Sequence, residues 1–236
     1  MRALITGGSK GIGFAIAEAM AAAGGKVMIT GRDRMRVNSA VTALAKSAAA
    51  GADVRGAAAD VRDREAIEAA IDEAAAAFGG LDTLINNAGV GVFTDVENMS
   101  DEDWRRVIDT NLTGAFFASR AAIPHLKRAG GGWIINIASL AGRNYFAEGA
   151  AYCASKAGLV AFSESLMLEL RNDNIRVSCV MPGSVATEFN GPHEKEDESW
   201  KLTGDDIAEV VMDLLRHPKR SLPSKIEIRP AKTART

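Results

Sequence analysis

Short apolar runs alternate along the chain with longer segments in which apolar residues recur at helical spacing. Several of the short runs are apolar at nearly every position, which is typical of strands that are covered on both faces of a sheet. We predict a strand over each of seven runs: residues 3–6, 26–30, 54–59, 83–86, 133–137, 176–180 and 225–228.

The alanine-rich segments between these runs predict helices. Ser100 before three acids and Thr203 three positions before Asp206 are helix-start signals. Asn111 has poor helix propensity, so we expect two helices to meet near it. The predicted helices cover residues 13–23, 34–49, 64–78, 101–128, 152–170 and 205–215.

This alternation predicts an α/β fold, a doubly wound parallel sheet with right-handed crossovers and helices on both faces. We detect no linker, repeat or break in composition, so we predict a single domain over residues 1–236. The one long irregular segment, residues 189–200, carries the charged run Glu194, Lys195, Glu196, Asp197 and Glu198.

Composition narrows the classes of function. The net charge of −2 and the scattered basic residues argue against a nucleic-acid partner and an anionic membrane surface. Two cysteines and three histidines without ligand spacing predict no metal site, no disulfide framework and a cytoplasmic location. We expect no signal peptide, and no apolar run approaches the roughly 18 residues of a membrane span.

A glycine-rich turn follows the first predicted strand: Thr6-Gly7-Gly8-Ser9-Lys10-Gly11-Ile12-Gly13. Between a strand and a helix, such a turn lets the backbone approach a pyrophosphate, whose charge the helix N-terminus then holds. The alternative is a glycine-rich turn without a ligand, and the spacing is not the common G-x-G-x-x-G. The candidate ligand contacts are Gly7, Ser9, Lys10, Gly11, Ile12 and Gly13.

The end of the second strand indicates which dinucleotide binds. In NAD-binding sheets, an acid at this point accepts bonds from the adenosine ribose. Here Gly31 is followed by Arg32, which suits a 2′-phosphate together with Lys10. We therefore favour NADP(H) over NAD(H), although a shift of one residue in the strand end would let Asp33 serve NAD(H).

Tyr152 and Lys156 have the spacing of neighbours on one helix face. A phenol has a pKa of about 10, and a nearby cation would lower it toward the working range of an acid/base group. The pair alone would be read as an ordinary surface pair. Ser139 follows the apolar strand 133–137 at the ligand-binding edge, where it is either a substrate contact or a helix cap.

The ordered set of motifs resembles the short-chain dehydrogenase/reductases over essentially the whole chain. This resemblance implies a Rossmann fold with strand order 3-2-1-4-5-6-7. The motifs are Thr6-Gly7-x-x-x-Gly11-x-Gly13, Asp60-Val61, Asn86-Asn87-Ala88-Gly89, Asn111, Ser139, Tyr152-x-x-x-Lys156 and Pro182-Gly183-Ser184-Val185-Ala186-Thr187.

The resemblance also implies roles for these positions. Tyr152 is the expected general acid/base, and Lys156 is expected to lower the pKa of the tyrosine and bind the nicotinamide ribose. Ser139 would polarise the carbonyl, and Asn111 would hold a water in a proton relay. Further cofactor contacts are expected at Arg32, Asp60, Val61, Asn87, Ala88, Gly89, Pro182, Gly183, Val185 and Thr187. Of these, the resemblance places residues 60–61 and 87–89 on the adenosine side and residues 182–187 at the carboxamide.

The expected activity is hydride transfer between NADP(H) and a small-molecule carbonyl/alcohol pair. Two alternatives stay open: a 3-oxoacyl-acyl-carrier-protein reductase, and a non-enzymatic NADP-sensing protein. Members of the family are usually homodimers or homotetramers, with helices 112–128 and 152–170 at one interface. The short basic tail after residue 228 lacks the common Gly-Gly ending of the family, which puts the tetramer interface in doubt.

For the substrate, we expect a small apolar or aromatic carbonyl compound in a pocket formed by residues 140–146, the turn after Gly89 and residues 189–200. Pocket-lining candidates are Tyr145, Phe146, Phe189 and Trp200. Docking of an acidic carrier protein is favoured by basic residues around the active-site entrance. The acidic run 194–198 and an acid in the turn 171–174 would repel such a partner and therefore argue against it.

Overall fold

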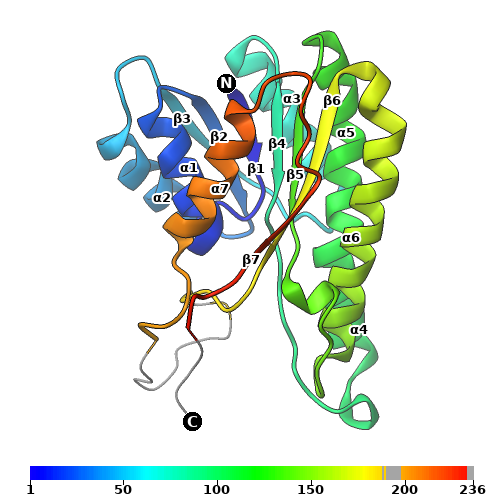
Figure 1. The fold of residues 1–236 in the computed structure, drawn as a ribbon. Coiled ribbons are helices and arrows are strands. Elements are labelled where there is room, and N and C mark those ends of the chain that lie inside the picture. The colour runs from blue at the N-terminus through cyan, green and yellow to red at the C-terminus, as the bar shows by residue number, and fades with distance from the viewer. Residues whose placement is uncertain (188, 190–197, 233–236) are drawn as a thin grey trace.

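The computed structural model describes residues 1–187, 189 and 198–232. One parallel sheet runs in the order β3-β2-β1-β4-β5-β6-β7, which confirms the predicted fold class and strand order (Figure 1). Each strand lies within two residues of its predicted bounds. The strands are β1 (Arg2–Ile5), β2 (Lys26–Gly31), β3 (Asp53–Ala58), β4 (Thr83–Asn86), β5 (Gly132–Ile137), β6 (Ile175–Pro182) and β7 (Lys225–Ile228).

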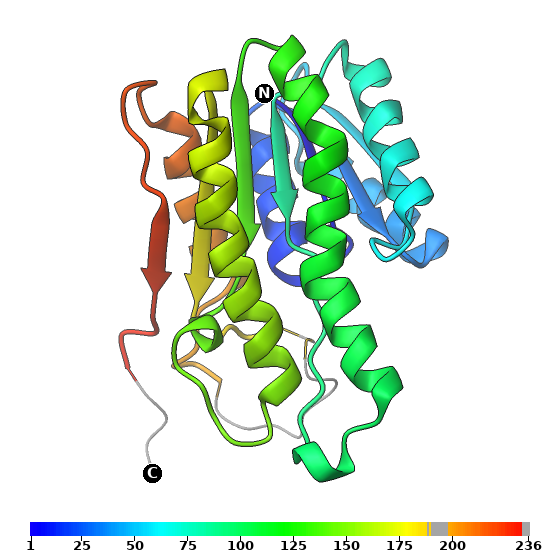
Figure 2. The same ribbon diagram turned by 90° about the vertical axis from the view of Figure 1, so that its right-hand side faces the viewer.

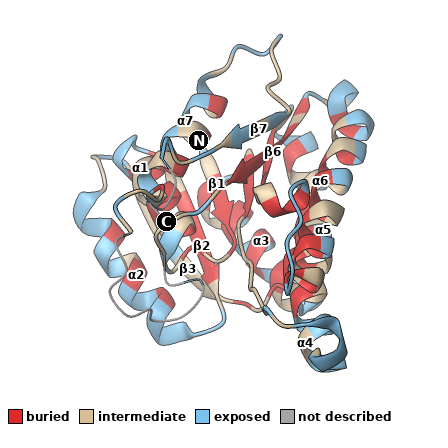
Figure 3. Ribbon diagram, turned by 60° about the horizontal axis from the view of Figure 1, so that its bottom comes forward, coloured by how far each residue is buried: buried red, intermediate tan, exposed pale blue. Residues whose placement is uncertain are grey.

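Helices cover both faces of the sheet (Figures 1 and 2). One side holds α1 (Gly11–Ala22), α2 (Arg34–Ser47) and α7 (Gly204–Arg216). The other holds α3 (Arg64–Phe78), α5 (Gly114–Arg128) and α6 (Ala150–Leu170). Each layer buries its own apolar cluster against the central strands, and Figure 3 shows this core in red between the helices.

Side-chain caps begin several helices where the sequence predicts them. Ser100 accepts a hydrogen bond from the Asp103 backbone at 3.1 Å at the start of α4 (Asp101–Ile108). Thr203 and Asp206 form the predicted capping box of α7. Helices α4 and α5 are joined by a π-helical turn, Asp109–Thr113, which contains Asn111. The two helices therefore meet where the poor helix propensity of Asn111 indicates.

The carboxyl ends of the strands lie together at the lower end of the molecule in Figure 1. Because all strands are parallel, the loops that follow them converge at this edge. No helix among the described residues is long and apolar enough to cross a membrane. In the same part of the chain, no group of three or more His, Cys, Asp or Glu residues is placed to hold a metal ion.

Candidate active site

The carboxyl ends of the strands border a cavity of about 1380 Å³. Two predicted site residues, Gly13 and Asn111, are not in its wall but contact residues that are. The other predicted residues all line it: Gly7, Ser9, Lys10, Gly11, Ile12, Arg32, Asp60, Val61, Asn87, Ala88, Gly89, Ser139, Tyr152, Lys156, Pro182, Gly183, Val185 and Thr187.

The glycine-rich turn between β1 and α1 depends on its glycines. Gly7 and Gly11 have φ angles of +66° and +57°, in the left-handed region that favours glycine. A Cβ atom on Gly13 would lie 2.4 Å from the Asn87 Nδ2 atom and 2.6 Å from the Gly7 carbonyl oxygen. A side chain at position 13 would therefore displace the turn from the end of β4.

Side chains hold this turn against the segment after β4. Asn87 Nδ2 donates to the carbonyl oxygens of Thr6 and Gly7, at 3.0 and 3.1 Å. The Thr6 hydroxyl accepts hydrogen bonds from the backbone N–H groups of Asn87 and Ala88, at 3.0 and 3.1 Å. Thr6 belongs to the motif quoted above but is absent from the predicted site residues. Its hydroxyl joins the two loops that border the cavity.

The start of α1 fits the pyrophosphate of a dinucleotide. Lys10 is the N-cap of the helix, its side chain makes no capping hydrogen bond, and the first turn holds no acid. Gly11 and Ile12 of that turn line the cavity. Helix N-termini attract anions because their backbone N–H groups and the helix dipole point outward.

Cationic side chains gather near the end of β2, where Lys10, Arg32 and Arg36 all line the cavity. Asp33, the alternative ribose acceptor, also lines the cavity. Its Oδ1 caps α2 by accepting from the backbone N–H groups of Met35 and Arg36, at 2.9 and 3.1 Å, and its Oδ2 lies 3.6 Å from Arg36 Nε. Arg36 is absent from the predicted set, although its position in the first turn of α2, four residues after Arg32, is a signal that could have identified it.

Asp60 and Val61 form the adjoining wall of the cavity. Arg62 Nη2 lies 2.6 Å from Asp60 Oδ2. The hydrogen bond from the Arg62 side chain lowers the pKa of Asp60, burial partly offsets this, and the charge of Arg32 lowers it further. The Arg32 guanidinium therefore lies within electrostatic reach of Asp60, on the side of the cavity expected to take adenosine.

On the other side, the end of β6 turns along the cavity. The Gly183 N–H donates to the Ile228 carbonyl at 2.8 Å, and Val185 forms a parallel bridge with Leu202. A Cβ atom on Gly183 would lie 2.9 Å from the Pro230 ring. The segment expected to contact the carboxamide is therefore held by β7 and the residues beside α7.

Ser139 and Tyr152 form the polar centre of this end of the cavity. Ser139 Oγ accepts a hydrogen bond from the Ala141 N–H at 3.1 Å, so it caps the short 3-10 helix Leu140–Gly142. Burial raises the pKa of Tyr152 above its usual 10.0, and a hydrogen bond with Ser139 offsets part of this rise. Ser139 is therefore a helix cap, and its place in the cavity wall also leaves it accessible to a substrate, the other interpretation.

Lys156 lies one helical turn after Tyr152 and is only 4% exposed. Its Nζ donates to the Ile137 carbonyl at 2.9 Å and lies 5.8 Å from the centre of the Tyr152 ring. Burial lowers the pKa of Lys156 to about 8. We expected Lys156 to lower the pKa of Tyr152, but in the structure this pKa is raised. Burial of the phenol is the largest effect on it, and the Lys156 ammonium donates to the Ile137 carbonyl.

The Asn111 side chain connects the loop after β4 to α6, the helix that carries Tyr152 and Lys156. Its Oδ1 accepts from the Val90 N–H at 2.8 Å, and its Nδ2 donates to the Val90 carbonyl and to Ser155 Oγ, both at 2.9 Å. The Ser155 hydroxyl in turn donates to the Tyr152 carbonyl at 2.7 Å. Ser155 is thus a further residue that supports the site, absent from the predicted set.

The aromatic wall differs in part from the expectation. Phe146, Phe189 and Trp200 line the cavity, whereas Tyr145 does not and is 70% exposed. Phe93, in the loop after β4, also lines the cavity and was not predicted. Its ring centre lies 5.6 Å from that of Tyr152.

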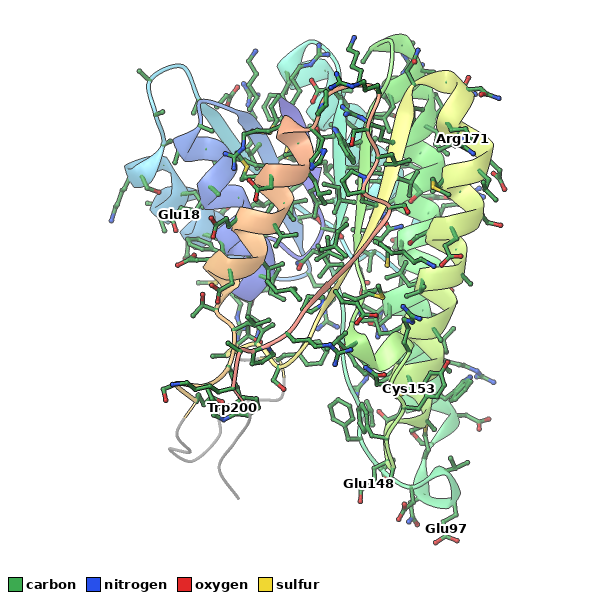
Figure 4. The ribbon with its side chains drawn as sticks, viewed as in Figure 1. Glu18, Glu97, Glu148, Cys153, Arg171 and Trp200 are labelled. Carbon is green, nitrogen blue, oxygen red and sulfur yellow. The ribbon has the colours of Figure 1, made fainter. Side chains whose placement is uncertain are left out.

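The turn 171–174, whose acid Asp173 we expected near the docking surface of a carrier protein, does not border the cavity. Figure 4 labels Arg171 at one end of the molecule and Cys153 at the other. Helix α6 has 21 residues, and at about 1.5 Å per residue it carries the turn roughly 30 Å away. Of the acidic run 194–198, only Glu198 lies within the described residues, and it pairs with Lys201 at 2.6 Å.

Known proteins share both the sequence and the fold. Residues 1–198 match the family model described as short chain dehydrogenase. A curated relative from Staphylococcus aureus (strain MRSA252), described as an uncharacterized oxidoreductase, is 32% identical over 228 residues, which cover 97% of this chain and 96% of the relative.

Two solved structures extend the likeness. A metagenomic short-chain oxidoreductase in complex with NADP has 36% identity and a TM-score of 0.84, with 98% of this chain and 97% of that chain covered. A 3-ketoacyl-ACP reductase from Sinorhizobium meliloti 1021 has 30% identity and a TM-score of 0.86, with 97% of each chain covered.

Proposed function

The chain belongs to the short-chain dehydrogenase/reductase family of oxidoreductases, and on this premise we propose that it transfers a hydride between NADP(H) and a carbonyl/alcohol pair. One observation carries the proposal. The glycine-rich turn, the cationic end of β2 and the group Ser139, Tyr152 and Lys156 all face one cavity. A dinucleotide and a small carbonyl compound therefore meet at the polar centre.

The residues around that centre have separate roles in the proposed reaction. The phenol of Tyr152 gives its proton to the carbonyl oxygen during reduction and removes it during oxidation. The Ser139 hydroxyl, which lines the same part of the cavity wall, orients and polarises the same oxygen. Lys156 binds ribose hydroxyls, and Asn111 contributes to the proton relay. Bound NADP(H) supplies or accepts the hydride.

The cofactor is NADP(H) rather than NAD(H). Arg32, Lys10 and Arg36 supply positive charge for a 2′-phosphate. The competing acid, Asp33, uses its carboxylate on the start of α2. The solved relative in complex with NADP supports the same choice.

A second candidate, reduction of a 3-oxoacyl group on acyl carrier protein, is supported by the likeness to the Sinorhizobium meliloti enzyme. A third, a non-enzymatic NADP sensor, conflicts with the presence of Asn111, Ser139, Tyr152 and Lys156 at their expected positions. An acetoacetyl thioester on acyl carrier protein, assayed beside small ketones over a salt series, separates the first two. Efficient carrier-dependent turnover that weakens with salt would favour the carrier substrate.

The protein is further proposed to be a cytoplasmic homo-oligomer that pairs through α5 and α6. Phe116 on α5 is 39% exposed and meets Phe162 of α6 edge to face, at 6.4 Å between ring centres. Exposed aromatic surface of this kind is common at interfaces. The buried free thiols of Cys153 and Cys179 suit a reducing compartment. Light scattering on the purified chain measures the oligomeric state.

The experiment that tests the proposed chemistry uses the two tyrosines of the chain. Tyr152→Phe should lower NADPH-dependent reduction of a carbonyl panel by on the order of a hundredfold or more. Tyr145→Phe is the matched control and should retain full activity, because Tyr145 lies outside the cavity wall. NADPH binding should survive in both variants. Near-full activity in Tyr152→Phe would show that the proton comes from another group.

A further inference from the structure

Two phenylalanine rings contact the ring of Tyr152, and a third lies against one of them. The ring centres of Phe93 and Phe189 lie 5.6 and 5.7 Å from that of Tyr152, at interplanar angles of 66° and 59°. Phe146 lies 5.9 Å from Phe93. The three rings come from the loop after β4, the loop after β5 and the segment after β6, so three separate connections place aromatic surface at the proposed reacting group.

These rings are not core residues. Phe93, Phe146 and Phe189 are 39%, 49% and 40% exposed, whereas the core residue Phe78 is 3% exposed. Apolar surface that remains exposed inside a cavity is available to a ligand, and burying it is favourable at about 25 cal/mol per Å². The part of the cavity beside Tyr152 therefore favours a substrate with an apolar body.

The arrangement of the rings depends on two glycines. A Cβ atom on Gly149 would lie 2.5 Å from the Phe146 ring. A Cβ atom on Gly91 would lie 2.7 Å from the Phe93 ring and 2.9 Å from that of Phe189. All three rings thus lie directly against backbone, and a side chain at either glycine would displace them.

Apart from Lys232 and the cations near β2, the cationic side chains of Lys201 and Arg229 in the cavity wall are paired with acids. Glu198 and Lys201 pair with each other at 2.6 Å, and Arg229 pairs with Glu227 at 2.9 Å. The cations near β2 lie on the side proposed to bind the cofactor phosphate. A neutral ligand therefore suits the ring cluster better than a carboxylate or a phosphate ester.

We propose that the substrate is a neutral carbonyl compound that carries an aromatic ring, and that Phe93, Phe146 and Phe189 hold this ring. The inference rests on the proposed function. The rings favour tilted and edge-to-face contacts, the geometries that aromatic pairs prefer. In the reaction, a ketone and NADPH with one proton give the alcohol and NADP⁺. The hydride goes to the carbonyl carbon, and the Tyr152 proton goes to the oxygen.

The test compares phenylacetone with cyclohexylacetone, two unconjugated methyl ketones of similar size that differ in aromaticity. Wild type should reduce phenylacetone with a kcat/KM about tenfold higher, the scale of a favourable aromatic contact. Phe93→Leu keeps an apolar side chain and should bring the ratio near one. Tyr145→Leu, the matched control outside the cavity wall, should keep the wild-type ratio. Equal kcat/KM values in wild type, or an unchanged ratio in both Phe93→Leu and Phe189→Leu, would overturn the inference.

A binding measurement separates this inference from the proposed chemistry. The Tyr152→Phe protein with NADPH bound should bind phenylacetone more tightly than cyclohexylacetone in a calorimetric titration. Equal affinities would refute the aromatic site whether or not the wild type reduces ketones. Tighter binding of phenylacetone without reduction of any carbonyl by the wild type would support the site and refute the proposed function.

Discussion

Replacement of Arg32 by alanine should remove most of the preference for NADPH over NADH. Arg32 directly follows β2 and lines the cavity. A hydrogen bond to a charged group contributes about 1.5–3 kcal/mol. Because Arg32 is exposed, we expect the lower end of this range, which corresponds to roughly a tenfold change in Kd. NADPH should therefore bind about tenfold more weakly to Arg32→Ala, while NADH binding stays nearly unchanged.

Fluorescence titration of both cofactors measures this preference, and Asp33→Ala is the adjacent control. Loss of the Asp33 cap should cost about 1 kcal/mol of stability, seen as a lower Tm, but should leave NADH affinity unchanged, because its carboxylate holds α2. Equal affinity of the wild type for both cofactors would refute this reasoning. Weaker NADH binding by Asp33→Ala would assign the ribose contact to Asp33.

Ser155→Ala should lower kcat by about threefold to tenfold, the equivalent of one neutral hydrogen bond, because Asn111 loses its contact with α6. Ser163→Ala is the control, because it removes a similar buried contact on the same helix. It should lower the stability by a similar amount and leave kcat unchanged. Equal kcat values for Ser155→Ala and Ser163→Ala would contradict the supporting role of Ser155. The rate of reduction should fall as pH rises past about 8, because burial lowers the pKa of Lys156 to that value and the ammonium is lost above it. The raised pKa of Tyr152 keeps the phenol protonated in that range. Initial rates over a buffer series at saturating NADPH test this, and a flat profile there would refute it.

The sequence predicts the central strands well because the pattern of apolar residues along each strand reflects which positions are buried. In β5, every residue of the predicted run 133–137 is buried, which matches a sequence that is apolar at every position except Asn136. The end of β6 is less predictable. It extends to Pro182 because Met181 and Pro182 align with Glu227 and Ile228 of β7, and strand pairing over such a distance has no local signal.

The same distinction applies to the site. The predicted residues lie in motifs at strand ends and in the Tyr152-x-x-x-Lys156 spacing, where local sequence and parallel topology determine their placement. Phe93 lies in an irregular loop, and its approach to Tyr152 depends on how Gly91 packs in the fold. Ser155 meets Asn111 across 44 positions of the chain, a contact that only the tertiary structure reveals.

The central claim is direct hydride transfer between NADP(H) and a carbonyl compound in the cavity beside Tyr152. NADPH that carries deuterium at its donor position tests this claim most directly, with phenylacetone as the substrate and mass spectrometry of the product. The account predicts that the alcohol formed carries one deuterium on its carbinol carbon. An alcohol without deuterium, or the absence of alcohol from this and every other carbonyl compound tried, would contradict it.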